Sequence, residues 1–287
     1  EGVELLIVRL PPGAHGAAAG HAAALRLKGD AQPSDLLEDG LVLERFQAAA
    51  QAGFATVEFL WPSGVDLDAL VAAKEDADVE VALFNIDAGD LPNGDRGFPN
   101  DPAKKDWWRE RAAVAFQLAR RLDARRINAL AGNEVPGLSR AEMLDCLCDN
   151  LLWAIPQAES AGVSLLLEPL NRFESPRYLL GRTTDALDVI ERLNSPRVQL
   201  QFDVYHTQRT EGNLVKLIQA HFQRIGHVQI ADSPARNQPG TGEINWRFVL
   251  GQLEKLGYGD FVGLEYNPAP NTLDALGTTQ GIGIGGA

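Results

Sequence analysis

Four polar side chains, each at the end of an apolar run, are of the types that bind divalent cations: Glu168, Asp203, Gln229 and Glu265. If the runs are strands of a parallel barrel, their carboxyl ends meet at one face, and we expect the four side chains to converge there. Three carboxylates held together without a cation would repel one another. Carboxylate and amide oxygens form a hard ligand set, so the sequence predicts one Mg²⁺ or Mn²⁺ ion.

Each of these residues also has an ordinary structural explanation. A carboxylate at a strand end can simply cap the following helix, which applies to Glu168, Asp203 and Glu265. A lone glutamine such as Gln229 can be a core amide whose hydrogen bonds are satisfied within the protein. The recurrence of all four residues at equivalent positions of consecutive strands favours the metal site.

Further polar groups follow the same strand ends. His206 is expected in the loop above the strand that ends at Asp203, within reach of a substrate hydroxyl. His227 lies two residues before Gln229, so it shares that strand face one layer deeper and is expected to support the site from the core. The proline- and glycine-rich loop 234–244 reads on its own as a turn. Its position after a ligand strand suggests that its backbone N–H groups approach an anion and that Arg236 pairs with a substrate carboxylate.

Apolar runs alternate with helical patterns from about residue 41 onward. The predicted strands are 55–60, 80–85, 126–131, 163–170, 198–202, 225–231 and 261–266. The predicted helices include 41–52, 102–122, 139–161, 184–193, 212–222 and 246–256. Continuous apolar runs are typical of parallel strands buried on both faces. The length of 287 residues suits one α/β barrel of about 250 residues, so a (β/α)₈ TIM barrel is predicted.

An eighth strand is needed to close this barrel, and it must come from residues 1–40, where 3–10 and 23–27 are the candidates. We therefore expect an irregular N-terminal segment at 1–40, a barrel domain at 41–275 and a flexible glycine-rich tail at 276–287.

Composition limits the partners. With 26 basic and 39 acidic residues the net charge is −13, and no basic block is present, so neither nucleic acid nor an anionic membrane is an expected partner. No apolar run approaches the roughly 20 residues that span a bilayer. Cys146 and Cys148 would point to different sides of a helix, which suits no disulfide and fits a reducing cytoplasm. We expect a small-molecule substrate; assembly into a homo-oligomer stays open.

Six ordered motifs between about residues 43 and 272 carry a family resemblance: 57–60 (VEFL), 168–171 (EPLN), 202–206 (FDVYH), 226–232 (GHVQIAD), 239–245 (PGTGEIN) and 263–266 (GLEY). They resemble the hydroxypyruvate isomerase family within the xylose isomerase-like barrels. The intervals of 35, 26 and 36 residues that separate the four candidate ligands are close to that family's pattern. Residues 1–40 do not resemble the family's first strand, and Arg236-Asn237-Gln238 stands where the family often has Arg-His-Glu.

The resemblance implies a metal-dependent aldose–ketose isomerase that converts hydroxypyruvate to tartronate semialdehyde by enediolate proton transfer. Glu168 and Glu265 would be the two catalytic glutamates, and Glu168, Asp203, Gln229 and Glu265 the metal ligands. The run 168–174 is also similar to ketose 3-epimerases, in which a glutamate at the position of Glu174 helps to bind sugar hydroxyls.

Several alternatives remain at this stage. A 2-oxotetronate isomerase or a ketose 3-epimerase of the same fold fits the motifs too. An apurinic endonuclease with this barrel would need a histidine-rich zinc cluster and a basic DNA face, which five histidines on a chain of charge −13 do not supply. A barrel that binds a small acid without turnover is the non-enzymatic alternative, and metal content together with activity would distinguish it.

Overall fold

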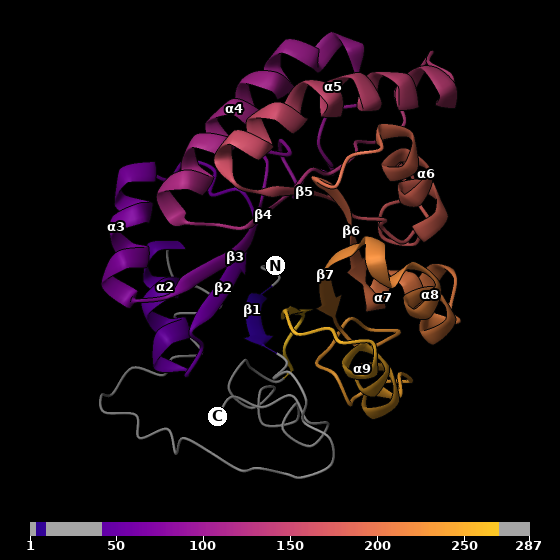
Figure 1. Ribbon diagram of the computed structural model, residues 1–287. Helices are drawn as coiled ribbons and strands as arrows, with labels where there is room; N and C mark the ends of the chain where they lie inside the picture. The colour runs from indigo at the N-terminus through magenta and orange to yellow at the C-terminus, as the bar shows by residue number, and fades with distance from the viewer. Residues whose placement is uncertain (1–3, 10–41, 270–287) are drawn as a thin grey trace.

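The computed structural model describes residues 4–9 and 42–269, in which the strands close into a barrel in the order β1 to β8 (Figure 1). The strands are β1 (Glu4–Arg9), β2 (Thr56–Phe59), β3 (Glu80–Asn85), β4 (Arg126–Asn128), β5 (Ser164–Leu167), β6 (Val198–Asp203), β7 (Ile225–Ile230) and β8 (Phe261–Tyr266). From β2 to β8 every neighbouring pair is parallel. The predicted TIM barrel is therefore confirmed.

Helices alternate with these strands and surround them (Figure 1). They are α2 (Val42–Gln51), α3 (Leu67–Ala77), α4 (Lys105–Leu122), α5 (Arg140–Ala161), α6 (Thr183–Leu193), α7 (Val204–Thr210), α8 (Leu214–His221) and α9 (Trp246–Lys255), with short 3₁₀ turns at Pro102–Lys104 and Phe222–Arg224. α3 is an additional helix between two predicted strands, and it begins where the Asp66 carboxylate accepts from two backbone N–H groups of its first turn. Among the residues described, no helix combines the length and the apolar character needed to cross a bilayer.

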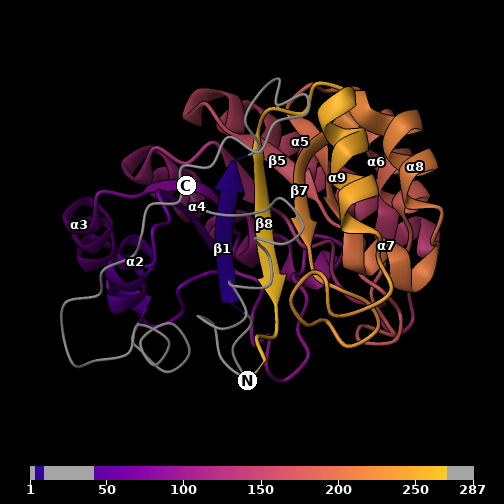
Figure 2. The same ribbon diagram turned by 90° about the horizontal axis from the view of Figure 1, so that it is seen from below.

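β1 differs from the expected barrel in its direction. It falls within the candidate segment 3–10, as predicted, but it is antiparallel to both β2 and β8, and Figure 2 shows its arrow opposed to that of β8. Six residue pairs, from Glu4↔Tyr266 to Arg9↔Phe261, join it to β8. Either direction satisfies the edge groups of a neighbouring strand, and hydrophobicity does not encode direction. The alternative strand at 23–27 and the expected tail at 276–287 lie outside the described residues.

Two strands end three residues earlier than predicted. β4 stops at Asn128 rather than 131, and β5 stops at Leu167 rather than 170. The apolar residues that follow pair with a neighbouring loop: Leu170 donates its N–H to Leu180, and Leu179 donates to Gly132. The polar residue Glu168 therefore stands just past its strand, at the carboxyl end of the barrel.

Local capping explains why the longest helix has the predicted limits. Ser139 and Glu142 form a reciprocal capping box at the start of α5, and Gly162 ends the helix with a φ of 75°. That left-handed conformation is costly for residues with a Cβ atom. Within α5, Cys148 is buried and Cys146 is partly exposed, and both are free, as expected.

The loop after β4 depends on one buried hydroxyl. The Tyr178 hydroxyl oxygen accepts a 2.7 Å hydrogen bond from the N–H of Ala131, and both residues are fully buried. Tyr178→Phe would leave this N–H without a partner, so we expect the free energy of unfolding to fall by about 1–3 kcal/mol. Urea denaturation measures the change. A variant as stable as the parent protein would mean that this bond does not hold the loop.

Candidate active site and metal centre

A cavity of about 660 Å³ opens at the carboxyl end of the barrel. Six of the seven residues predicted to form the site line it: Glu168, Glu174, His206, Gln229, Arg236 and Glu265. The seventh, Asp203, is buried at the end of β6. The barrel thus gathers residues that are almost 100 positions apart in the sequence.

One group within this site has the composition of a metal centre. Glu168, Asp203 and His206 each offer a ligand atom, and these atoms lie within 4.8 Å of one another. Asp203 Oδ2 is buried and has no hydrogen-bond partner in the described part of the chain. A buried carboxylate oxygen without a donor is costly unless a cation or proton meets it. The two carboxylates of this group therefore fit a divalent cation.

The expected ligands are distributed unevenly around this group. Glu168 and Asp203 belong to it and Glu265 does not, and both Gln229 and Glu265 line the same cavity. His206 is the group's third member, although the sequence indicated a role in substrate binding.

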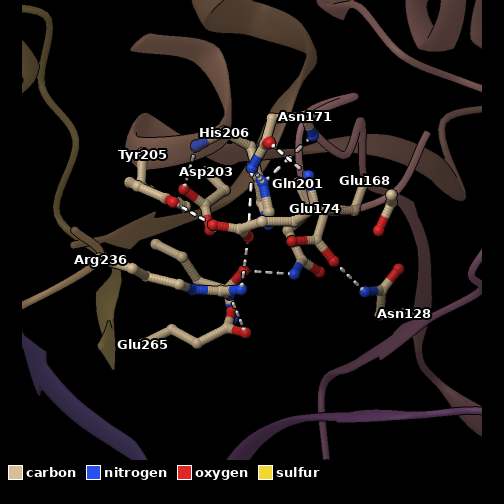
Figure 3. Close-up of polar contacts among 12 residues, drawn as sticks. Asn128, Glu168, Asn171, Glu174, Gln201, Asp203, Tyr205, His206, Arg236 and Glu265 are labelled. Atoms are coloured by element: carbon tan, nitrogen blue, oxygen red, sulfur yellow. Dashed lines mark hydrogen bonds and ion pairs between the residues drawn. The ribbon is translucent and has the colours of Figure 1, made fainter. Parts of the chain in front are cut away.

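The expectation that His206 lies in a loop is wrong. Asp203 caps α7, and its Oδ1 accepts a 3.0 Å hydrogen bond from the N–H of His206 in the first helical turn. Capping and metal binding are thus compatible for Asp203, because its other oxygen stays available. On the far side of the His206 ring, Nδ1 lies 3.2 Å from the N–H of Asn171 and 2.8 Å from that residue's Nδ2. Figure 3 shows His206 and Asn171 side by side.

Burial and neighbouring carboxylates raise the pKa values of Glu168, Asp203 and Glu265. Burial, followed by the charges of Glu265 and Asp203, holds the pKa of Glu168 well above its usual range. Burial raises the pKa of Glu265 to about 8 and that of Asp203 to about 6, although Arg236 opposes both shifts. Asn128 stabilises ionised Glu168 through a 2.7 Å hydrogen bond to Oε2. A cluster with this titration behaviour is characteristic of functional sites.

Arg236 lies among the carboxylates of the site and forms ion pairs with two of them (Figure 3). It donates from Nη2 to Glu265 at 2.6 Å and from Nη1 to Glu174 at 3.4 Å, and its guanidinium lies 5.4 Å from the centre of the Tyr205 ring. Tyr205 in turn donates its hydroxyl hydrogen to Glu174. Burial lowers the pKa of Arg236, but the carboxylates, Glu265 foremost, raise it above its usual value.

The loop that carries Arg236 is organised by Asp232. Its carboxylate accepts hydrogen bonds from the N–H groups of Gly240 at 2.8 Å and Ile244 at 3.2 Å, and from Nε1 of Trp246 at 2.8 Å. The loop N–H groups do approach an anion, but that anion is a side chain of the protein. Gly242 is required here because a Cβ atom would lie 2.1 Å from the carbonyl oxygen of Ser233.

Some polar residues of the site were not assigned a role from the sequence. They are Glu58, Asn128, Asn171, Gln201 and Tyr205. Glu58 carries the clearest signal, because a carboxylate within the apolar run 57–60 cannot be buried without partners. One of its partners is His227, which is fully buried, as expected of a residue one layer deeper in the barrel; that it supports the site stays a prediction. The amides carry no such signal, since an asparagine at a strand end has many ordinary roles.

Comparison with known proteins places these features in a family. The family model described as "Xylose isomerase-like TIM barrel" matches residues 46–280. The chain is 37% identical over 230 residues to the hydroxypyruvate isomerase of Escherichia coli K12, covering 80% of this chain and 89% of that protein. It is 33% identical to a 2-oxo-tetronate isomerase of Pectobacterium atrosepticum, covering 86% and 94% respectively.

A solved structure is similar to the chain in both fold and sequence. The crystal structure named AP endonuclease, family 2, from Brucella melitensis aligns with a TM-score of 0.78 and 35% identity, covering 82% of this chain and 90% of that one.

The raised carboxylate pKa values predict how the metal-free protein responds to pH. For Glu265 the window runs from its ordinary pKa of 4.5 to about 8. Within it the folded state binds more protons than the unfolded state, so stability should fall as the pH rises. Thermal unfolding with a chelator present should show this decline, and Glu265→Gln should flatten it. Added Mn²⁺ should stabilise the protein more at the upper end of the window, because it binds ionised carboxylates. Stability that rises with pH in chelator would contradict this account.

Proposed function

Because the chain belongs to the xylose isomerase-like TIM barrel family and, within it, to the hydroxypyruvate isomerases, we propose that it interconverts a small hydroxy-oxo acid between its aldehyde and ketone forms. Hydroxypyruvate and tartronate semialdehyde are the proposed pair. The chain is an isomerase, and the proposal concerns its substrate, its metal dependence and the roles of its residues.

The observation that carries this proposal is the pair of carboxylates Glu168, which is buried, and Glu265, which is partly buried. Glu168 follows the end of β5 and Glu265 belongs to β8; both line one cavity, and they are close enough for their charges to interact. Isomerisation moves a proton between adjacent carbons, which requires one group to remove it and one to return it. Glu168 and Glu265 are the two carboxylates proposed for these tasks.

Glu168, Asp203, Gln229 and Glu265 are the proposed ligands of one Mg²⁺ or Mn²⁺ ion. When bound, such an ion polarises the substrate carbonyl and stabilises negative charge on the substrate oxygens. Oδ2 of Asp203 has no hydrogen-bond partner among the described residues, which supports the assignment of Asp203 as a ligand.

His206 suits the substrate better than the cation. Its Nδ1 accepts from the backbone N–H of Asn171, so the neutral ring carries its hydrogen on Nε2. That nitrogen can donate to a substrate hydroxyl but offers no lone pair to a metal. Burial also holds the pKa of His206 well below its usual value, which keeps the ring neutral.

Arg236 and Glu174 are proposed to orient the rest of the substrate. Arg236 is the cation for the substrate carboxylate, and a bound acid would compete with Glu265 and Glu174 for the guanidinium. Glu174, anchored by Tyr205, is placed to accept from a hydroxyl group. Binding of the acid would thus release Glu265 from its ion pair.

A 2-oxotetronate isomerase is the second candidate, favoured by the relative of that name and by the cavity. The cavity volume of about 660 Å³ is far larger than the volume of a three-carbon acid, so the cavity can accommodate a fourth carbon. A ketose 3-epimerase of the same fold is a further alternative. Cytoplasmic location, the absence of nucleic-acid and membrane partners, and homo-oligomer formation stay predictions.

The proton-transfer roles can be tested with Glu168→Gln and Glu265→Gln. Each variant keeps an oxygen at the same position but cannot accept a proton from carbon, so we expect kcat to fall by about 10²–10⁴-fold at saturating Mn²⁺. Steady-state assays with hydroxypyruvate and 2-oxotetronate would measure this. Glu191→Gln, an exposed position in α6, is the matched control and should retain full activity. Full activity in either site variant would remove that glutamate from the mechanism.

A further inference from the structure

Glu58 is a buried carboxylate in β2 to which the proposed function gives no task. Its side chain is almost inaccessible, and both of its oxygens bond to residues of β7. Oε1 lies 2.9 Å from Nε2 of Gln229, and Oε2 lies 2.7 Å from Nε2 of His227. Because β2 and β7 are not neighbours in the barrel, these bonds cross its interior.

These contacts determine the orientation of the Gln229 amide. The oxygen and nitrogen of an amide group have almost the same size, so packing alone barely distinguishes the two orientations. An ionised carboxylate only accepts hydrogen bonds, so the NH₂ group of Gln229 must face Glu58. On the other side, Oε1 of Gln229 accepts from Nε2 of Gln201. The amide oxygen, with a second lone pair, is therefore directed away from Glu58.

The surrounding chain makes room for this carboxylate. Gly263 lies in β8, and a Cβ atom there would come within 2.1 Å of Glu58 Oε1. His227 supplies the second hydrogen bond from a fully buried ring. Its Nδ1 has no partner among the described residues, as expected if that nitrogen is unprotonated and Nε2 carries the hydrogen toward Glu58.

We propose that Glu58 is a positioning residue for the cation site: it fixes the Gln229 amide so that the oxygen, and not the NH₂ group, is available as a ligand. This inference rests on the proposed function, because it takes Gln229 as a ligand. A flipped amide would present N–H hydrogens to the cation and could not bind it. Glu58 thus acts through Gln229.

Exchanging the acid and the amide tests this directly. In Glu58→Gln the new NH₂ group can face Gln229 and favour the flipped amide. We expect the dissociation constant for Mn²⁺, measured by calorimetry or electron paramagnetic resonance on chelator-treated protein, to rise about 10–100-fold. Glu80→Gln, at the exposed start of β3, makes the same chemical change and should leave Mn²⁺ binding unaltered.

The reciprocal change provides the rescue. Gln229→Glu alone would set two carboxylates against each other where the 2.9 Å hydrogen bond now lies, so its metal-free form should melt at a lower temperature than wild type. In the double variant Glu58→Gln/Gln229→Glu, the carboxylate at 229 accepts from the new amide and offers an oxygen in either rotamer. We expect it to recover the melting temperature and most of the Mn²⁺ affinity.

The outcomes separate the inference from the proposed function. If the wild-type protein binds Mn²⁺ and Glu58→Gln binds it with the same affinity, the positioning role alone is overturned. This holds even if the variant melts at a lower temperature. A double variant that neither melts at a higher temperature than Gln229→Glu nor binds Mn²⁺ more tightly than Glu58→Gln would also overturn the positioning role. If Glu58→Gln does not fold, the double variant is compared with Gln229→Glu, and the absence of rescue overturns the role. Wild-type protein that binds no Mn²⁺ would overturn the metal site and this inference together.

Discussion

Several carboxylates lie close together at the mouth of the barrel, and the rest of the site is organised around that electrostatic cost. Glu168 and Asp203 are buried and Glu265 is partly buried, and burial is the largest cause of their raised pKa values. An ionised group in such surroundings must be paired, hydrogen-bonded or neutralised by a proton. The barrel supplies hydrogen-bond donors unevenly: Asn128 donates to Glu168, whereas one oxygen of Asp203 has no partner among the residues that the structure describes.

Arg236 provides the positive charge that the protein itself contributes. Its ion pair with Glu265 is partly buried, and such a pair contributes most where its geometry is fixed. The fixing comes from the loop, which folds around the Asp232 carboxylate and positions Arg236 over Tyr205. A cation among the carboxylates and an acid on the guanidinium would redistribute the same charges, so metal and substrate binding are expected to be coupled.

The parts of this structure that could be predicted from the sequence are those with a local signal. Seven strands from β2 to β8 follow from continuous apolar runs. Polar residues that end or follow these strands predicted that Glu168, His206, Gln229, Arg236 and Glu265 would lie together, and all five line one cavity, whereas Glu174 was expected there only from a family resemblance. The direction of β1 could not be predicted, because the hydrophobic pattern of a strand does not determine whether it pairs with its neighbours in parallel or antiparallel orientation. The helical position of His206 depends on the cap made by Asp203, and the role of Glu58 depends on contacts across the barrel to β7. Such contacts have no periodicity that a single sequence would reveal.

The central claim is that Glu168 and Glu265 move a proton, with a divalent cation present, between adjacent carbons of a small acid. The most direct measurement follows hydroxypyruvate in D₂O by NMR with Mn²⁺-saturated protein that is then diluted into Mg²⁺ to avoid line broadening. We predict that deuterium from the solvent appears on the carbon that receives the proton, and that a chelator abolishes the reaction. Isomerisation that retains the substrate's own hydrogen without exchange would indicate a hydride shift, and undiminished turnover in chelator would exclude the cation; either result would contradict the account.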